Sequence, residues 1–268
     1  MEKRIIGRGV LLGALGGLLA FAFARILSEP ITDRAIDYEH GREDAQMALD
    51  KAAGKPMDMD MGAELFTRSQ QANIGLGFGV IVLGAAMGAL FAVVYFLALR
   101  KAGKISGRNL ALLVSGGMFL VVYAVPFLKY PANPPGSSDG DTIKERTAMF
   151  VLMIAISAVA LVAAVWLGRR LAARLGNWNA SIAAAAAFTV VMAVVMLVLP
   201  SYSDETPEPL KNSSGTIVYP GFPAADLYHF RLYSFAAQLI LWLVIGVGFA
   251  WLAPRLLGER TENAPAAA

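Results

Sequence analysis

Six long apolar runs, with no charged residue near their centres, constrain this chain more than any other feature. About 20 apolar residues in a helix cross the hydrocarbon core of a bilayer. Only helices and closed barrels satisfy all backbone hydrogen bonds in lipid. We therefore predict an all-α, polytopic membrane protein with about six transmembrane helices, and one integral membrane domain over residues 1–268. The expected spans are 5–27, 73–99, 110–128, 148–167, 180–199 and 233–252.

The overall composition agrees with a membrane protein. Hydrophobic residues make up 57% of the chain and charged residues only 16%, whereas soluble domains carry about 25% charged residues. The net charge of +3 does not indicate nucleic acid binding, because the basic residues gather at one predicted membrane face. Cysteine is absent, which excludes disulfides and thiolate metal sites.

The basic residues predict the orientation of the spans. Short cytoplasmic flanks are enriched in lysine and arginine. The basic flanks are 3–8, 100–108, 169–174 and 255–260, and most acidic residues fall in the loops 28–72, 129–147 and 200–232. Both termini are accordingly expected in the cytoplasm, with the three acidic loops outside. The six spans would then form up to three helical hairpins.

The first apolar run allows two interpretations. Lys3 and Arg4 followed by an apolar core and Ala22-Phe23-Ala24 resemble a cleavable secretory signal. Glycines repeated every four residues instead favour a retained helix, because small residues let two membrane helices approach closely. We expect the first two spans to pack together through Gly9, Gly13 and Gly17 on one side and Gly75, Gly79, Gly84 and Gly88 on the other.

The stretch from Ser28 to His40 carries the strongest chemical signal. In a helix, Glu29, Asp33 and Asp37 follow one another at four-residue spacing, with His40 three residues further. Carboxylates and imidazole together are ligands for divalent metal ions. The alternative is a solvated acidic face that caps a membrane helix.

Two further groups of residues extend this hypothesis. Asp226 and His229 are three residues apart and could add ligands from the last outer loop. Met57–Met61 alternates methionine with aspartate and is either a cation contact or a plain connector.

Three arginines also stand at the predicted outer ends of returning helices, namely Arg68, Arg146 and Arg231. Helix N-termini and outer flanks both disfavour arginine, so each is expected to have a carboxylate or carbonyl partner. If Glu29 and Asp33 are those partners, they are structural counter-ions first. Asp37 and His40 would then be the more available metal ligands.

Motifs for enzymatic chemistry are missing from the sequence. It contains no GxxxxGK[ST] phosphate loop, no HExxH and no GxSxG, so neither ATP hydrolysis nor metalloprotease or serine-hydrolase chemistry is indicated. The spans also lack the central ionisable residue that coupled pumps use. We expect a protein that is not an enzyme and has no permanently bound cofactor.

Three segments of the chain are distinctive. They are Glu29-Pro-Ile-Thr-Asp-Arg-Ala-Ile, then Val125-Pro-Phe-Leu-Lys-Tyr-Pro-Ala-Asn-Pro-Pro135 with Thr142-Ile and Arg146-Thr, and Phe222-Pro with Phe230-Arg231 and Trp242. Together they resemble the CbtA family of predicted cobalt transporter subunits. The resemblance covers nearly the whole chain, and the Leu-Lys-Tyr-Pro-Ala-Asn-Pro-Pro run is its most specific part.

That resemblance implies a multi-pass protein of the bacterial inner membrane. It implies cobalt as the transported ion, and a small single-span, histidine-bearing CbtB subunit as partner. The family is usually described with about five spans, one fewer than expected here. A second function stays open, that of a non-transporting assembly or sensing subunit whose outer loops bind another protein.

Overall fold

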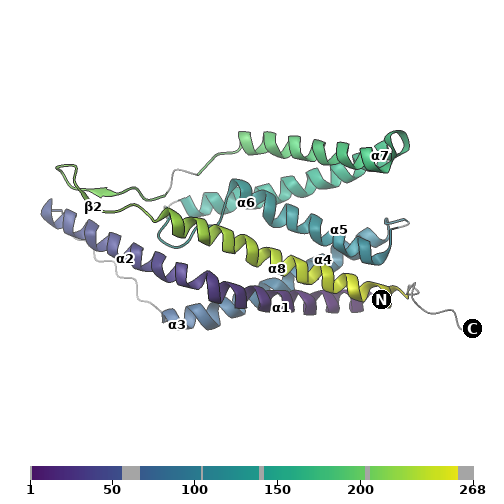
Figure 1. Cartoon of the computed structure of the whole chain (residues 1–268), viewed down its shortest axis with the longest axis horizontal. Coiled ribbons are helices and arrows are strands. Elements are labelled where there is room, and N and C mark those ends of the chain that lie inside the picture. Colours follow the sequence, from purple (N-terminus) through teal and green to yellow (C-terminus); the bar gives the residue numbers. More distant parts are fainter. Residues whose placement is uncertain (1, 56–66, 104, 139–141, 203–205, 259–268) are drawn as a thin grey trace, which may run out of the picture. The chain divides into compact units, whose positions relative to one another are not determined.

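The computed structural model describes residues 2–55, 67–103, 105–138, 142–202 and 206–258, and most of them are helical (Figure 1). The helices are α1 (Glu2–Leu27), α2 (Glu29–Ala52), α3 (Arg68–Gln70), α4 (Leu76–Leu99), α5 (Gly107–Phe119), α6 (Val125–Lys129), α7 (Ile143–Val198) and α8 (Ala224–Leu257). Two π-helical turns, η1 (Gln71–Gly75) and η2 (Leu120–Ala124), join α3 to α4 and α5 to α6. The strands β1 (Leu210–Lys211) and β2 (Ile217–Tyr219) form one antiparallel hairpin.

Five of these continuous helical stretches are long and apolar enough to cross a membrane, which confirms a helical, polytopic membrane protein. All six predicted spans lie on them, because α7 contains two. Its 56 residues would reach about 84 Å if straight, far beyond one bilayer. At Gly176 the backbone leaves the helical region with φ 73° and ψ 163°, and Figure 1 shows α7 turning back there.

Contacts across the turn confirm that the two halves of α7 fold against each other. A Cβ placed on Gly168 would lie 3.2 Å from the Cβ of Ala184 and 3.7 Å from the carbonyl oxygen of Ala180. Residues so distant along one straight helix could not touch. The positive φ at Gly176 belongs to the left-handed region that favours glycine, so this residue permits the reversal.

The chain divides into two compact units that are each discontinuous in sequence. One contains residues 1–25, 68–120 and 235–268, and the other contains residues 26–67 and 121–234. Each unit includes helices with exposed large apolar side chains, such as Leu11 in the first and Val159 in the second. Exposed apolar surface of this kind is typical of a membrane-facing helix.

The first unit is built on a close crossing of α1 and α4. A Cβ on Gly13 or Gly84 would collide with the backbone carbonyl of the other glycine, and Gly9 and Gly88 form a second such pair. A Cβ placed on Gly17 would likewise lie 2.6 Å from the carbonyl oxygen of Val80. The two backbones are therefore in direct contact, as the four-residue glycine repeat predicts.

Two of the seven predicted packing glycines lie elsewhere. An added Cβ on Gly79 would meet nothing within 4 Å, and one on Gly75 would meet only the carbonyl oxygen of Gln70. These two glycines are not at the contact with α1, because Gly79 and Gly84 are five residues apart in the regular helix α4 and therefore lie on different sides of it. Gly16, outside the repeat, instead contacts Leu241 of α8.

Aromatic rings and a buried hydrogen bond complete this unit. Phe91, Tyr95 and Phe249 are buried, and the rings of Tyr95 and Phe249 meet edge to face with centroids 4.8 Å apart. The Ser115 hydroxyl donates to the carbonyl oxygen of Trp242 at 2.7 Å. Polar groups in an apolar interior need such partners, so these contacts fix α4, α5 and α8 to one another.

The π-helical turn η2 ends at Ala124, two residues before Pro126. Proline lacks an N–H, and its ring clashes with the carbonyl four residues earlier. The wider π turn relieves that clash, and the helix continues through α6 to Lys129. The helix therefore passes Pro126 and ends just before Pro131.

Candidate functional site

Helix α2 has one buried face and one exposed face. Ile31, Ala35 and Tyr38 are buried at the i, i+4 and i+7 positions that form a helical stripe. Asp33 and Asp37 are exposed on another side. Pro30 occupies the first turn, where its missing N–H costs no hydrogen bond. The sequence thus forms a polar helix, about 36 Å long, that is held by its apolar stripe.

Tyr38 is the centre of that attachment. Its ring lies 4.9 Å from the ring of Phe222 and 5.4 Å from that of Tyr219, centroid to centroid. Its hydroxyl donates to the carbonyl oxygen of Pro220 at 3.0 Å. The Tyr219 hydroxyl in turn donates to the backbone carbonyl of Tyr38 at 3.2 Å. Together these contacts bind α2 to the segment before α8.

The β-hairpin supplies Tyr219 and was not predicted. Its turn is closed by Asn212, whose side-chain oxygen accepts hydrogen bonds from the backbone N–H groups of Ser214 and Thr216. Gly215 follows with φ 81°. An Asn-Ser-Ser-Gly turn before Thr-Ile-Val-Tyr is a hairpin signal, and it could have been recognised within the loop 200–232.

An ion pair joins α2 to the first turn of α8. The Arg34 guanidinium donates from Nη2 to Asp226 Oδ1 at 2.5 Å and from Nε to both carboxylate oxygens at 3.2 Å. This contact raises the pKa of the Arg34 guanidinium. Arg34 was missed as a site residue, although it lies inside the Glu29–Ile36 segment. The predicted metal ligand Asp226 is therefore engaged by a cation.

Arg231 binds the proline-rich loop. Its Nε and Nη2 donate to the side-chain oxygen of Asn133 at 3.2 and 2.7 Å, and the Asn133 amide donates to Ser138 Oγ at 2.8 Å. The buried Ser137 hydroxyl donates to the carbonyl oxygen of Pro134 at 2.6 Å. Arg231 is thus paired with a neutral side-chain amide of the Tyr-Pro-Ala-Asn-Pro-Pro run. The amide oxygen is a carbonyl, one of the two kinds of partner expected for this arginine from the sequence.

Beside this loop lies a cleft of about 590 Å³, here called the aromatic cleft. Its walls come from the end of η2 and α6, the proline-rich loop and the first turns of α7. Arg146, a predicted counter-ion residue, contributes to it. The lining aromatic residues are Tyr123, Phe127, Tyr130 and Phe150.

The six predicted metal ligands have different surroundings. Glu29 is buried, while Asp33, Asp37, His40 and His229 are exposed and Asp226 is part-buried. His229 stacks on Tyr233 with ring centroids 5.9 Å apart. Within the described residues, no group of three or more histidine, aspartate or glutamate side chains is arranged to hold one ion. The Met57–Met61 segment lies outside the described residues.

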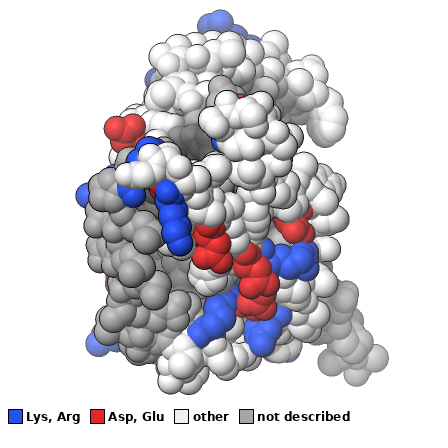
Figure 2. All heavy atoms as spheres, turned by 90° about the vertical axis from the view of Figure 1, so that its left-hand side faces the viewer, with Lys and Arg blue, Asp and Glu red and all other residues white. Residues whose placement is uncertain are grey.

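The predicted pairing of Glu29 and Asp33 with Arg68, Arg146 and Arg231 stays a prediction. Ion pairs join Arg34 to Asp226 and Lys55 to Asp50. Lys55 and Gln46 lower the pKa of the Asp50 carboxyl by hydrogen bonding. Figure 2 shows acidic and basic side chains interspersed on one face of the molecule.

The family of probable cobalt transporter subunits called CbtA has a model that matches residues 2–254 of the 268. The chain belongs to the CbtA family. Neither a curated protein nor a solved structure matches it. The match covers both compact units and all the spanning helices, and a family of subunits implies that this CbtA protein works in a complex with a partner.

Proposed function

We propose that this CbtA-family protein is a subunit of an inner-membrane uptake system for divalent cations, with cobalt as its cargo, and that α2 gathers the cation at the outer face. The observation that carries the proposal is the two-faced character of α2. Its apolar stripe is fastened through Tyr38, and its opposite face presents Asp33, Asp37 and His40 to solvent. We call these three residues the acidic face.

Attraction of a hydrated cation needs no closed ligand cage. Helix α2 carries seven acidic and three basic side chains, so it has a net charge of −4 before histidine protonation. A negative surface raises the local cation concentration and speeds capture, and salt weakens both effects. Asp33, Asp37 and His40 fall on one side of the helix, where one or two of them could replace water on a passing ion.

The other predicted ligands receive different roles in this proposal. Asp226 forms an ion pair with Arg34, so its first role is to position α2, and any contact of its carboxylate with metal comes later. Glu29 is buried at the start of α2 and His229 lies beside the aromatic rings of Tyr228 and Tyr233. These three would receive the cation only after the acidic face has collected it.

A role in assembly is the second candidate. The aromatic cleft supports it, because aromatic and proline side chains are typical of surfaces that bind proteins. A small single-span CbtB-type subunit is the partner we propose for the complex. Neither candidate function is enzymatic, in keeping with a family of transporter subunits.

Uptake of radiolabelled cobalt by a deletion strain tests the proposal. Cells that carry Asp33→Asn/Asp37→Asn are expected to take up cobalt several-fold more slowly at limiting cobalt and low ionic strength, since two carboxylates leave the acidic face. High salt is expected to reduce the difference from wild type. Protein abundance in the membrane is measured in parallel.

A matched control removes two carboxylates from the same helix away from the acidic face. Glu43→Gln/Asp50→Asn has the same net charge as the test variant and is expected to have a smaller effect. Normal uptake by Asp33→Asn/Asp37→Asn at wild-type abundance would remove the acidic face from the mechanism. Normal uptake by the deletion strain itself at limiting cobalt would instead reject the transport function.

A further inference from the structure

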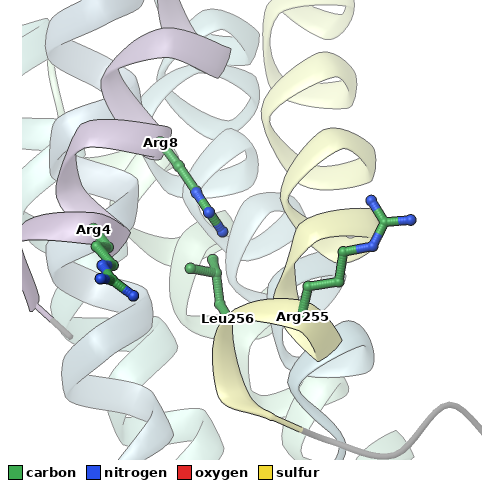
Figure 3. A pocket seen from close by; sticks show the side chains of 4 residues that line it. All are labelled: Arg4, Arg8, Arg255 and Leu256. Carbon is green, nitrogen blue, oxygen red and sulfur yellow. The ribbon is translucent and has the colours of Figure 1, made fainter.

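The start of α1 and the end of α8 enclose a small basic pocket in the first unit. It has a volume of about 200 Å³ and is lined by Arg4, Arg8, Arg255 and Leu256. Arg4 and Arg8 are one helical turn apart on α1, and both side chains extend toward Leu256 of α8, whereas the guanidinium of Arg255 turns away from them (Figure 3). We call this site the arginine pocket. With a water molecule occupying about 30 Å³, it has room for a group of several heavy atoms.

The charge of the arginine pocket calls for an anion. Three arginines line the pocket, the side chains of Arg4 and Arg8 extend into it, and no carboxylate lines it in the part of the chain that the structure describes. Arginine remains protonated at all physiological pH values. Its planar fork of N–H donors matches the oxygens of a phosphate group and binds them in a bidentate manner. The pocket therefore has the chemistry of a phosphate site.

Its surroundings place that phosphate at a membrane surface. Arg255 stacks over the ring of Trp251, 4.2 Å from the ring centroid, and Trp251 is 60% exposed. Exposed tryptophan next to basic residues is typical of the headgroup level of a bilayer. The basic flanks predict that this end faces the cytoplasm, where anionic lipids attract clustered lysine and arginine.

An apolar stripe continues from the two α1 arginines into the membrane span. Leu11 and Leu15 follow Arg8 at i+3 and i+7, so they lie on the same side of α1. Their exposed fractions are 70% and 47%. The pocket could therefore bind a phosphate headgroup, and the adjacent leucines could contact an acyl chain of the same lipid. A free phosphate ion has no acyl chain and would not use the leucines.

We propose that the arginine pocket binds the phosphate group of an anionic phospholipid, with an acyl chain along Leu11 and Leu15. The positive-inside bias accounts for basic residues at this end of the helices. It does not account for arginines from both ends of the chain around one cavity. The bound phosphate would accept hydrogen bonds from Arg4 and Arg8 of α1, and Arg255 of α8 would add a positive charge beside it.

Lipid retention by the full-length protein tests this site. Arg4→Gln/Arg8→Gln/Arg255→Gln is purified in mild detergent from the same membranes as wild type, and bound lipids are measured by native mass spectrometry. Wild type is expected to retain phosphatidylglycerol or cardiolipin. The triple variant is expected to retain about tenfold less, because charge-assisted hydrogen bonds dominate such binding. Equal retention by both proteins would overturn the proposal.

The control is a second set of three arginines at the same predicted membrane face. Arg169→Gln/Arg170→Gln/Arg174→Gln removes the same charge, and Arg170 also stacks over a tryptophan, Trp166, at 4.7 Å. This variant is expected to retain lipid like wild type. If it loses as much as the pocket variant, the binding is a general surface-charge effect and the arginine pocket is not a site.

Thermal melting separates the two sources of phosphate. Added phosphatidylglycerol is expected to raise the melting temperature of wild type more than phosphatidylcholine does, with no such difference in the pocket variant. Inorganic phosphate at the same concentration is expected to give no shift. A shift from inorganic phosphate as large as that from phosphatidylglycerol would reject a lipid. If the glutamine variant does not fold, Arg4→Lys/Arg8→Lys/Arg255→Lys replaces it and is expected to bind several-fold more weakly than wild type.

Discussion

Asp226 has two possible roles that a pair of substitutions can separate. It accepts hydrogen bonds from Arg34 across α2 and α8, and it is also a proposed late cation contact. Exposed ion pairs stabilise proteins by only about 0.2–1 kcal/mol, and the Arg34 side chain is 53% exposed. Stability therefore depends little on this pair, whereas its geometry positions the acidic face.

We expect Asp226→Asn to lower the free energy of unfolding by less than about 1 kcal/mol, measured by thermal melting in detergent. The exchanged pair Arg34→Asp/Asp226→Arg is expected to recover both stability and cobalt uptake if the contact is purely structural. Uptake that stays low in the exchanged variant, at restored stability, would show instead that the carboxylate at position 226 contacts the cation.

Tyr130 offers a test by pH. Its hydroxyl donates to the carbonyl oxygen of Pro200 at 2.9 Å, and burial, with a smaller contribution from Tyr202, raises the pKa of its phenol. A raised folded pKa favours the protonated form in the native state. Its stabilising contribution is therefore complete below the unfolded pKa of about 10 and is lost as the pH rises through the higher folded value.

The variant Tyr130→Phe removes both the hydrogen bond and the titration. At neutral pH we expect it to be about 1 kcal/mol less stable than wild type, the usual loss for one hydrogen bond. At pH values above about 10 the difference is expected to shrink. Melting temperatures at the two pH values measure this, and a constant difference would contradict the assigned role of the neutral phenol.

At the scale of elements, the crossing of α1 and α4 gives the sharpest expectation. Gly88→Leu would place a side chain against the backbone of Gly9 and Gly13, and overpacking costs about 1–3 kcal/mol or more. We expect a lower melting temperature and less protein in the membrane. Gly79→Leu on the same helix is the control, because a Cβ added there meets nothing within 4 Å, and it should behave like wild type.

Periodic features of the elements could be predicted from the sequence, and specific contacts could not. The stretch from Glu29 to His40, whose acidic residues were considered at helical spacing, belongs to α2 (Glu29–Ala52), because its apolar stripe repeats with the helical period. The pairing of Arg34 with Asp226 joins residues 192 positions apart. Only the tertiary fold brings such residues together, and no local pattern distinguishes Arg34 from other exposed arginines.

The glycine repeat shows what spacing alone can predict in one element. Gly84 and Gly88 pack against α1, whereas Gly79 lies five residues before Gly84 in the same regular helix and faces another side. This five-residue step is visible in the sequence, so the contact of Gly84 and Gly88 and the absence of Gly79 from it were both predictable.

At the scale of the whole molecule, the number of membrane-spanning helices determines on which side of the membrane each end of the chain lies. Six spans return the chain to its starting side, and five do not. Reporter fusions that are active only in the periplasm or only in the cytoplasm are expected to place residue 2 and residue 258 both in the cytoplasm. Opposite locations would mean that one half of α7 does not cross the membrane.

The reversal at Gly176 also has a consequence for biosynthesis. A turn this tight connects the two halves of α7 directly, so they would enter the membrane together as one hairpin. Arg169, Arg170 and Arg174 stand just before the turn and would keep it on the cytoplasmic side. A chain truncated at Gly176 is therefore expected to integrate poorly in a translation-coupled insertion assay, while one truncated after Val198 should integrate as well as the full chain.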